Sequence, residues 1–345
     1  MDMSMILNKS DVPKQSHSGR LLRLSALPEF TAFSVMAITL LILLLGSPYF
    51  LNGDNLESLQ TSVAPIAIVA IGMTILFVTG TFDLSVGATM GLSGLAAAFM
   101  LSKGMPAEVA IFAGIGIGVL VGLVNGLLVS IVGLNPLIVT LGTMYMLRGL
   151  IDVWIGGGRP QPWMYVSGPE VDSRFFSLGS LKLSGVYLIV WIAIVLVAVV
   201  DTAFRRAPVG RALFYAGGNP AAARSLGFPV KRLQLLGFVL CGALAAIAGL
   251  FTTAHTGLSS RYAGSGVELQ IIIACLIGGS SIAGGRGSIV GSAIGVIFIT
   301  LVNNAFNLFE VAAEWQKIVV GGVLVAVVVS DAWRLLRRQK RMKRD

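Results

Sequence analysis

The sequence predicts an all-α integral membrane protein, a polytopic helical bundle of about ten transmembrane helices with the N-terminus and the C-terminus in the cytoplasm. Composition is the first reason, because only 12% of the 345 residues are charged, 55% are hydrophobic and mean hydropathy is +0.86. Ordinary globular proteins are about 25% charged, and a soluble fold of this length needs more polar surface. A soluble enzyme, a soluble nucleic-acid-binding domain and a disordered chain are therefore excluded. Charge-free windows and clustered basic residues are the other two reasons.

Each expected transmembrane helix corresponds to a window without charged residues, since a bilayer core requires about 20 apolar residues per helix. The windows are 30–53, 58–82, 84–102, 109–147, 183–200, 233–254, 269–285, 287–309 and 318–330. The window 109–147 is too long for one helix, and Gly133-Leu134-Asn135-Pro136 divides it because proline cannot continue a helix. The last window is short, but it extends back through Trp315, which with Trp333 would mark opposite membrane interfaces. The total is ten spans.

The positions of the basic residues set the direction of the chain. The sequence has 25 Lys and Arg against 16 Asp and Glu, a net charge of +9. Seventeen of these basic residues lie in three segments: Lys9, Lys14, Arg20 and Arg23; Arg205, Arg206, Arg211, Arg224, Lys231 and Arg232; and Arg334, Arg337, Arg338, Lys340, Arg341, Lys343 and Arg344. Basic flanks of apolar spans stay in the cytoplasm, and six spans followed by four place all three segments there.

This topology divides the chain into a cytoplasmic N-terminal tail (1–29), one transmembrane domain (30–333) and a basic cytoplasmic tail (334–345). Within the domain we expect a cytoplasmic loop at about 204–232 and an outer loop at about 156–184. The positive charge is then a membrane-attracted cytoplasmic face, so the expected partner of this charge is membrane lipid and no nucleic acid.

Glycines repeat every four residues in two of the predicted helices. Residues four apart share one helix face, and small residues allow helix backbones to approach closely in lipid. We interpret both sets as helix-packing faces, and a ligand lying against bare backbone is the alternative. The segments 85–95 and 289–299 share this Gly-x3-Gly pattern, which is too short to prove an internal repeat. The packing glycines are Gly114, Gly118, Gly122 and Gly126 in one helix and Gly287, Gly291 and Gly295 in the other.

A few polar residues within or between the apolar windows are candidates for the translocation path. Asp83 is a carboxylate set between two apolar windows, where a buried charge is costly and usually functional. Aspartate also caps helices well, and a window begins directly after it, so capping is the favoured interpretation of Asp83. Asn303 and Asn307 share a helix face and either line a path or bond neighbouring helices. The candidates are Asp83, Ser85, Asn125, Asn303 and Asn307.

The loop 204–232 contains a short helix with clear ends. Asn219 is a good N-cap, Pro220 suits the first helical position, and Gly227 with Pro229 beyond it ends the helix. A simple connector does not need such stops, whereas a docking surface for a soluble partner does. An amphipathic turn resting on lipid headgroups is the alternative.

Signatures of catalysis and metal binding are missing from the sequence. Its two cysteines and two histidines form no zinc pattern, and it contains no nucleophile elbow, paired catalytic carboxylates or P-loop. We therefore expect a non-catalytic chain without a metal site or a bound cofactor, and any ATPase that drives transport must be another chain.

Four ordered motifs resemble the permease subunits of ribose/xylose/arabinose-type ATP-binding-cassette importers. Gly210-Arg211 followed by Ala216-x-Gly218-Asn219-x2-Ala222-Ala223-x3-Gly227 is similar to the family's cytoplasmic docking loop. The other three are Gly80-x2-Asp83-Leu84-Ser85-Val86-Gly87, Asn135-Pro136-Leu137-Ile138-Val139-Thr140-Leu141-Gly142-Thr143, and Ile277-Gly278-Gly279-x-Ser281-x2-Gly284-Gly285-x-Gly287. Together they lie within about 72–331, nearly the whole chain. Thr81-Phe82 replaces the Gly-Ile that the family has before the aspartate, so the exact backbone turn of the family is not expected there, while the family resemblance is unaffected.

The resemblance implies a multi-pass permease of the bacterial inner membrane that works as a pair, with a second copy or a paralogue. It implies a cytoplasmic ATPase subunit that uses ATP and Mg²⁺, an extracytoplasmic substrate-binding protein, and a monosaccharide or related small polar solute as substrate. The residues expected to dock the ATPase are Gly210, Arg211, Ala216, Gly218, Asn219, Ala222, Ala223 and Gly227. An ion-coupled secondary transporter or channel is the main alternative, and an integral-membrane enzyme is a weaker one.

Overall fold

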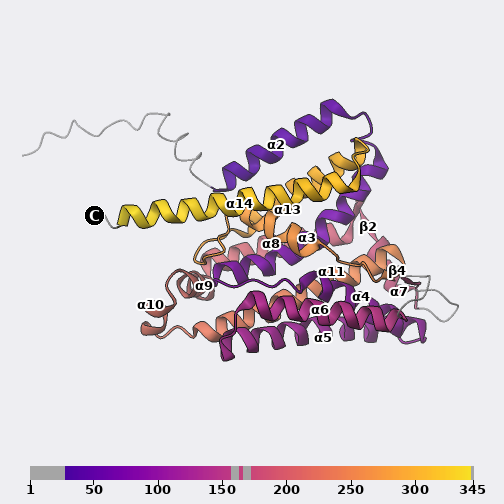
Figure 1. Cartoon of the computed structure of the whole chain (residues 1–345). Helices are drawn as coiled ribbons and strands as arrows, with labels where there is room; N and C mark the ends of the chain where they lie inside the picture. Colours follow the sequence, from indigo (N-terminus) through magenta and orange to yellow (C-terminus); the bar gives the residue numbers. More distant parts are fainter. Residues whose placement is uncertain (1–27, 157–162, 166–171, 343–345) are drawn as a thin grey trace, which may run out of the picture.

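The computed structural model describes residues 28–156, 163–165 and 172–342 as a bundle of helices (Figure 1). The predicted N-terminal tail up to residue 27, the parts 157–162 and 166–171 of the predicted outer loop, and residues 343–345 lie outside the described residues. The first half contains α2 (Pro28–Gly46), α3 (Gly53–Val78), α4 (Val86–Ser102), α5 (Ala107–Gly126), the π-helix η1 (Leu127–Val132) and α6 (Pro136–Ile155).

The second half begins with small elements and ends with long helices. Its helices are α7 (Arg174–Ser180), α8 (Leu188–Arg206), α9 (Pro208–Gly218), α10 (Pro220–Ser225), α11 (Val230–Thr256), α12 (Val267–Ile277), α13 (Ile289–Leu308) and α14 (Ala313–Met342). Strand β1 (Trp163–Tyr165) pairs antiparallel with β4 (Leu258–Ser260), and β2 (Lys182–Leu183) pairs antiparallel with β3 (Val186–Tyr187). Helix α14 continues to Met342 and so includes most of the predicted basic tail 334–345.

Among the described residues, six helical segments are long and apolar enough to cross a membrane: α3, α5 with η1, α6, α8, α11 and α13. Shorter apolar segments occur in α2, α4 and α12. The described chain is thus a polytopic helical membrane protein, as predicted. The predicted division of window 109–147 is also confirmed, because η1 ends at the left-handed Gly133 and Asn135 accepts the Leu137 N–H at 2.8 Å to begin α6.

Two helices differ in extent from their charge-free windows. The helix expected over 269–285 ends at Ile277, because Gly279, Gly284 and Gly285 adopt left-handed backbone conformations that glycine allows and a helix does not. Helix α6 continues past the end of its window at residue 147, through Arg148 to Ile155, and the Arg148 guanidinium donates to the Ala263 carbonyl at 2.6 Å. The charge-free window is therefore longer than the helix at α12 and ends before the helix does at α6.

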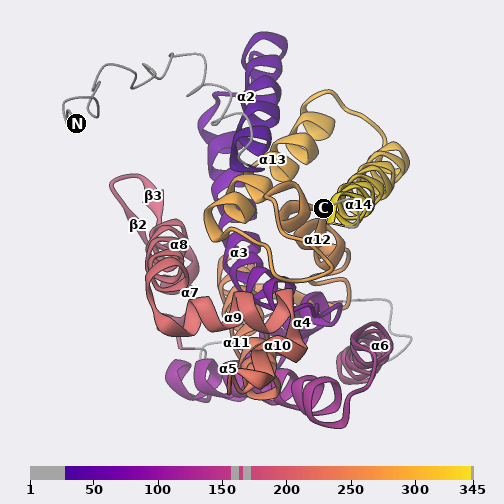
Figure 2. The same ribbon diagram turned by 90° about the vertical axis from the view of Figure 1, so that its left-hand side faces the viewer.

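The bundle has two distinct ends, which are seen at opposite sides of Figure 1. One end carries α9, α10 and the end of α14, and the other carries α7 and β4. Helix α11 packs against α3, α4 and α5, while α13 packs against α2, α3 and α12. Figure 2 looks along the bundle from the α9–α10 end and shows α14 and α6 on one flank, with α8 on the opposite flank.

Backbone-to-backbone contacts hold the helices close where glycines face a neighbour. The predicted glycines of α5 lie against α11: a Cβ on Gly118 would lie within 3.0 Å of the Gly242 carbonyl, and the converse also holds. Gly291 and Gly295 lie equally close to Gly278 and Ala274. Gly287, predicted on the same helix face, precedes α13 instead, because the Ser288 side chain caps that helix by accepting the Gly291 N–H at 3.1 Å.

Candidate functional site

The predicted loop 204–232 is a helical unit at the α9–α10 end of the bundle (Figure 2). Helix α8 continues to Arg206, and Pro208 and Pro220 each occupy the first turn of a new helix, where proline's missing N–H costs nothing. The sequence indicated only the second of these, α10. Its predicted cap is confirmed, because the Asn219 side chain accepts the Ala222 N–H at 3.0 Å, and Gly227 beyond the helix has a left-handed φ of 83°.

The eight predicted docking residues divide into a buried set and an exposed set. Gly210, Ala216 and Ala223 are buried, and both alanines pack in a cluster with Ile71 of α3 and Phe204 of α8. The exposed members are Arg211, Gly218, Asn219, Ala222 and Gly227. The buried set therefore anchors α9 and α10 on the membrane helices, while the exposed set remains available to a partner.

A close junction of glycines connects α9 to two non-helical segments within the bundle. We call Gly80, Gly217, Gly284 and Gly285 the glycine junction. A Cβ on Gly217 would lie within 3.0 Å of the Val78 carbonyl and 2.9 Å from the Gly285 nitrogen, whose N–H donates to that same carbonyl at 2.9 Å. A Cβ on Gly284 would lie 3.0 Å from the Gly80 Cα.

The junction brings the end of α9 against segment 79–85, which precedes α4, and segment 278–288, which precedes α13. At the junction the backbones of these segments pack directly against that of α9, and the Gly285 N–H donates to the Val78 carbonyl. Gly217 escaped the sequence interpretation because the matching motif names only its neighbours. The adjacent glycine pair at the end of a helix was the signal that was present.

Three of the predicted path residues form a closed hydrogen-bonded cluster. Asp83 Oδ1 accepts the backbone N–H of Ser85 at 2.7 Å and its hydroxyl at 2.6 Å. Asn125 Nδ2 donates to Ser85 Oγ at 3.0 Å and to Asp83 Oδ2 at 3.3 Å, and Thr143 donates to Asn125 Oδ1 at 2.7 Å. The Asp83 side chain is buried at 1% exposure. The cluster joins α5 and α6 to the turn before α4. The N-cap position of α4 is Ser85, and no described side chain caps that helix, so Asp83 holds the turn before the helix and does not cap it as predicted.

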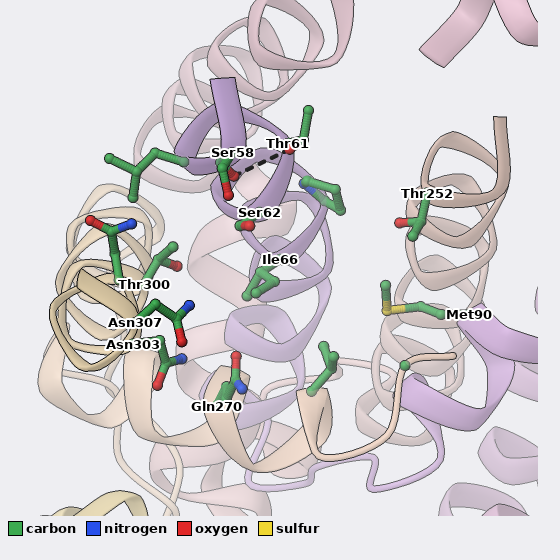
Figure 3. A pocket seen from close by; sticks show the side chains of 15 residues that line it. Ser58, Thr61, Ser62, Ile66, Met90, Thr252, Gln270, Thr300, Asn303 and Asn307 are labelled. Atoms are coloured by element: carbon green, nitrogen blue, oxygen red, sulfur yellow. Dashed lines mark hydrogen bonds between the residues drawn. The ribbon is translucent and has the colours of Figure 1, made fainter. Parts of the chain in front are cut away.

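The two other predicted path residues, Asn303 and Asn307, line a separate pocket among α3, α12 and α13 (Figure 3). The pocket has a volume of about 350 Å³, and it shares no residue with the Asp83 cluster. Its lining is Ser58, Leu59, Thr61, Ser62, Pro65, Ile66, Met90, Thr252, Gly264, Val267, Gln270, Thr300, Asn303, Asn304 and Asn307. The sequence interpretation missed Ser58, Thr61 and Ser62, although their spacing places them on adjacent positions of one helix face.

Comparison with known proteins assigns the chain to a family of transport proteins. The family described as branched-chain amino acid transport system, permease component, matches residues 55–328, which include the Asp83 cluster, the pocket, α9 and α10. The chain belongs to this family. It is therefore the permease component of an ATP-binding-cassette transport system, a multi-pass protein of the bacterial inner membrane and not an enzyme.

The sequence similarity to known proteins extends over most of the length of this permease. It is 34% identical to the probable ABC transporter permease protein y4mJ of Sinorhizobium fredii, over 88% of this chain and 89% of that protein. It is 32% identical to the autoinducer 2 import system permease protein LsrC of Escherichia coli (90% and 91%). It is also 32% identical to the ribose import permease protein RbsC of Haemophilus influenzae (88% and 93%). No solved structure matches the chain significantly.

The end of the permease opposite α9 carries exposed ion pairs. Arg174 of α7 bonds Glu108 of α5 and Asp172, and this guanidinium, with the Ala107 N–H, lowers the pKa of the Asp172 carboxyl. Lys182 of β2 pairs with Glu57 of α3, which raises the pKa of the lysine. Exposed ion pairs contribute little to stability, so these contacts mainly define which elements meet at this end.

Proposed function

We propose that this permease forms the membrane pathway of an importer for a monosaccharide or a related small polar solute, and that a separate ATPase docks on α9 and α10. The exposed face of α9 and α10 carries the proposal, because α10 is capped, both helices are anchored on the membrane helices by buried residues, and the end of α9 contacts the non-helical segments at the glycine junction. The eight docking residues named above would bind or support the ATPase. No cofactor is assigned to this chain, and ATP and Mg²⁺ would be used by the ATPase.

The proposed topology has ten spans: α2, α3, α4, α5 with η1, α6, α8, α11, α12, α13 and α14. The basic residues between the end of α8 and the start of α11 support a cytoplasmic position for the α9–α10 end. The other end, with α7 and its ion pairs, would then face an extracytoplasmic substrate-binding protein. Both chain termini would be cytoplasmic, and a second copy or a paralogue would complete the transporter.

A neutral substrate is favoured by two observations. The relatives include proteins named for import of ribose and of autoinducer 2. The fifteen described residues that line the pocket include no charged side chain. A zwitterionic amino acid, which the family description names, would have to give up its hydration at both charges without charged partners in this pocket, and that is costly.

The proposed mechanism is alternating access driven by ATP binding in the partner. Movement of the ATPase would displace α9 and α10, and the glycine junction would pass that displacement to segments 79–85 and 278–288. Rigid elements are required, since a flexible loop would absorb the movement. Because bare backbones meet at Gly217 and Gly284, small shifts require little side-chain repacking.

The test is transport by the purified permease reconstituted in proteoliposomes with its ATPase and binding protein. We expect uptake of a radiolabelled monosaccharide that requires ATP and ceases with a hydrolysis-deficient ATPase. Uptake that continues without ATP and collapses with the proton gradient would instead establish an ion-coupled transporter. Import of L-leucine in place of any monosaccharide would refute the assignment of a sugar substrate.

A further inference from the structure

We propose that the pocket among α3, α12 and α13 is a binding site for a neutral polyhydroxylated solute within a single copy of the permease. The proposal rests on the proposed function, and it adds that the permease itself, and not only its binding protein, recognises the substrate. The pocket lies toward the α7 end, since it is lined by the first turns of α3 and the last turns of α13. In the proposed topology this is the side from which an imported solute arrives.

A buried hydroxyl without a partner points into this pocket. Thr300 is 5% exposed, and its Oγ1 has no hydrogen-bond partner in the described part of the chain. A buried polar atom left without a partner is unfavourable, so such atoms usually have a ligand or water as partner. Because Thr300 lines the pocket, a solute in that space can supply the missing hydrogen bond.

The remaining polar side chains of the pocket differ in how firmly they are held. Asn304 exchanges hydrogen bonds with Asn55 at 2.6 and 3.3 Å, and the Thr252 hydroxyl donates to the Ala248 carbonyl at 2.9 Å. Figure 3 shows the carboxamides of Asn303 and Gln270 at the pocket from two different helices. Firmly held groups shape the site, while these two carboxamides, each with an NH2 group that donates and a carbonyl oxygen that accepts, suit hydroxyl groups of a ligand.

The chemistry of the lining sets the class of ligand. Hydroxyls and carboxamides occur together with apolar groups from Ile66, Met90 and Val267, a combination that matches a molecule with hydroxyl groups on a carbon ring. A volume of about 350 Å³ lies at the lower end of known small-molecule pockets, roughly 300–1,000 Å³, so it suits a monosaccharide rather than a larger solute. The uncharged lining disfavours ions and zwitterions.

The experiment measures equilibrium binding of radiolabelled D-ribose, D-xylose and L-arabinose to the purified full-length permease in lipid nanodiscs, with L-leucine as the zwitterionic comparison. The variants Thr300→Val and Asn303→Leu keep the number and branching of the side-chain heavy atoms and remove the hydrogen-bonding groups. The control is Thr256→Val, because Thr256 lies outside the pocket and its hydroxyl donates to the Thr252 carbonyl at 2.9 Å.

We expect at least one of the three sugars to bind, L-leucine not to bind, and each pocket variant to weaken sugar binding about three- to tenfold, the effect of one lost neutral hydrogen bond. The control should bind as the unaltered protein does. Thr300→Val removes an unpaired buried hydroxyl, so its melting temperature should not fall, which separates lost binding from misfolding.

Absence of binding by all three sugars, or unchanged binding in both pocket variants, overturns the proposal. The proteoliposome uptake assay separates this failure from failure of the proposed function. ATP-dependent sugar uptake by a permease that does not bind sugar in isolation refutes the pocket site and leaves the proposed function standing. Absence of sugar uptake altogether refutes both.

Discussion

Substitution of Gly217 by alanine is the most direct test of how α9 contacts the membrane helices. The added Cβ would overlap the Val78 carbonyl and lie 2.9 Å from the Gly285 nitrogen. Both are backbone atoms that cannot rotate away, and they bond each other at 2.9 Å, so any shift that relieves the clash also strains that hydrogen bond. Overpacking costs about 1–3 kcal/mol and a lost hydrogen bond about 0.5–1.5 kcal/mol.

The helix itself partly offsets this cost, because alanine is better than glycine in a helix by about 1 kcal/mol. The expected net loss of stability for Gly217→Ala is therefore on the order of 1–3 kcal/mol. Gly218→Ala is the matched control in the same helix, since its Cβ would meet only the Gly285 Cα, at an ordinary 3.7 Å. Its stability should equal or slightly exceed that of the unaltered permease, because alanine favours the helix.

Two assays follow each variant: thermal unfolding of the purified permease, and sugar uptake per ATP hydrolysed in proteoliposomes. Gly217→Ala should unfold a few degrees lower and transport less sugar per ATP, because the separated backbones no longer move together. Gly218→Ala should unfold at or slightly above the temperature of the unaltered protein, and it serves as a control for stability only, because Gly218 is one of the residues expected to dock the ATPase. The reasoning is refuted by a Gly217→Ala permease that is as stable as the Gly218→Ala permease and transports as much sugar per ATP as the unaltered protein.

Three further predictions concern single positions. Asn219→Ala removes the side chain that accepts the Ala222 N–H and caps α10. We expect a loss of about 0.5–2 kcal/mol of local stability and weaker binding of the ATPase in a surface-capture assay. Unchanged ATPase binding would contradict a docking role. Asp83→Ala leaves several buried donors unpaired, and each unpaired group costs about 1–3 kcal/mol. The variant should therefore have a lower melting temperature. Loss of transport at unchanged stability would instead place Asp83 in the solute path. Gly118→Ala should destabilise the permease in thermal unfolding, because its Cβ would meet the backbone of α11 within 3.0 Å. The control Gly116→Ala, whose Cβ would have nothing within 4 Å, should be neutral or slightly stabilising. Equal melting temperatures of the two variants would show that α5 can move away from α11.

Local signals in the sequence identified elements correctly where the physical cause is itself local. The cap at Asn219 and the break at Gly133–Pro136 depend on neighbouring backbone groups, so residue type and order were sufficient. The glycine repeat of α5 also follows from helix periodicity alone. Helix extents were less predictable, because a charged residue such as Arg148 can lie inside a helix when its partner is a carbonyl more than a hundred residues away in the chain.

The candidate site shows the same division. The polarity of Asn303 and Asn307 marked them as unusual in an apolar helix, but their pocket depends on hydroxyl side chains from α3, about 240 residues earlier. Asp83 and Asn125 were proposed for the same path, yet they bond each other in a closed cluster apart from that pocket. Polarity can be read from one position, whereas the partner of a polar group is decided by packing.

By itself, the sequence determined that this chain is a helical membrane protein and that a capped helix stands between its two groups of spans. Those properties follow from the overall composition, from the lengths of the apolar windows and from capping residues, whose partners lie a few residues away in the chain. Tertiary structure alone decided that Gly217 meets two non-helical segments and that one end of the bundle holds an uncharged pocket. The physical reason is that both depend on backbones and side chains brought together by helix packing, and contact between distant segments is not encoded at any single position.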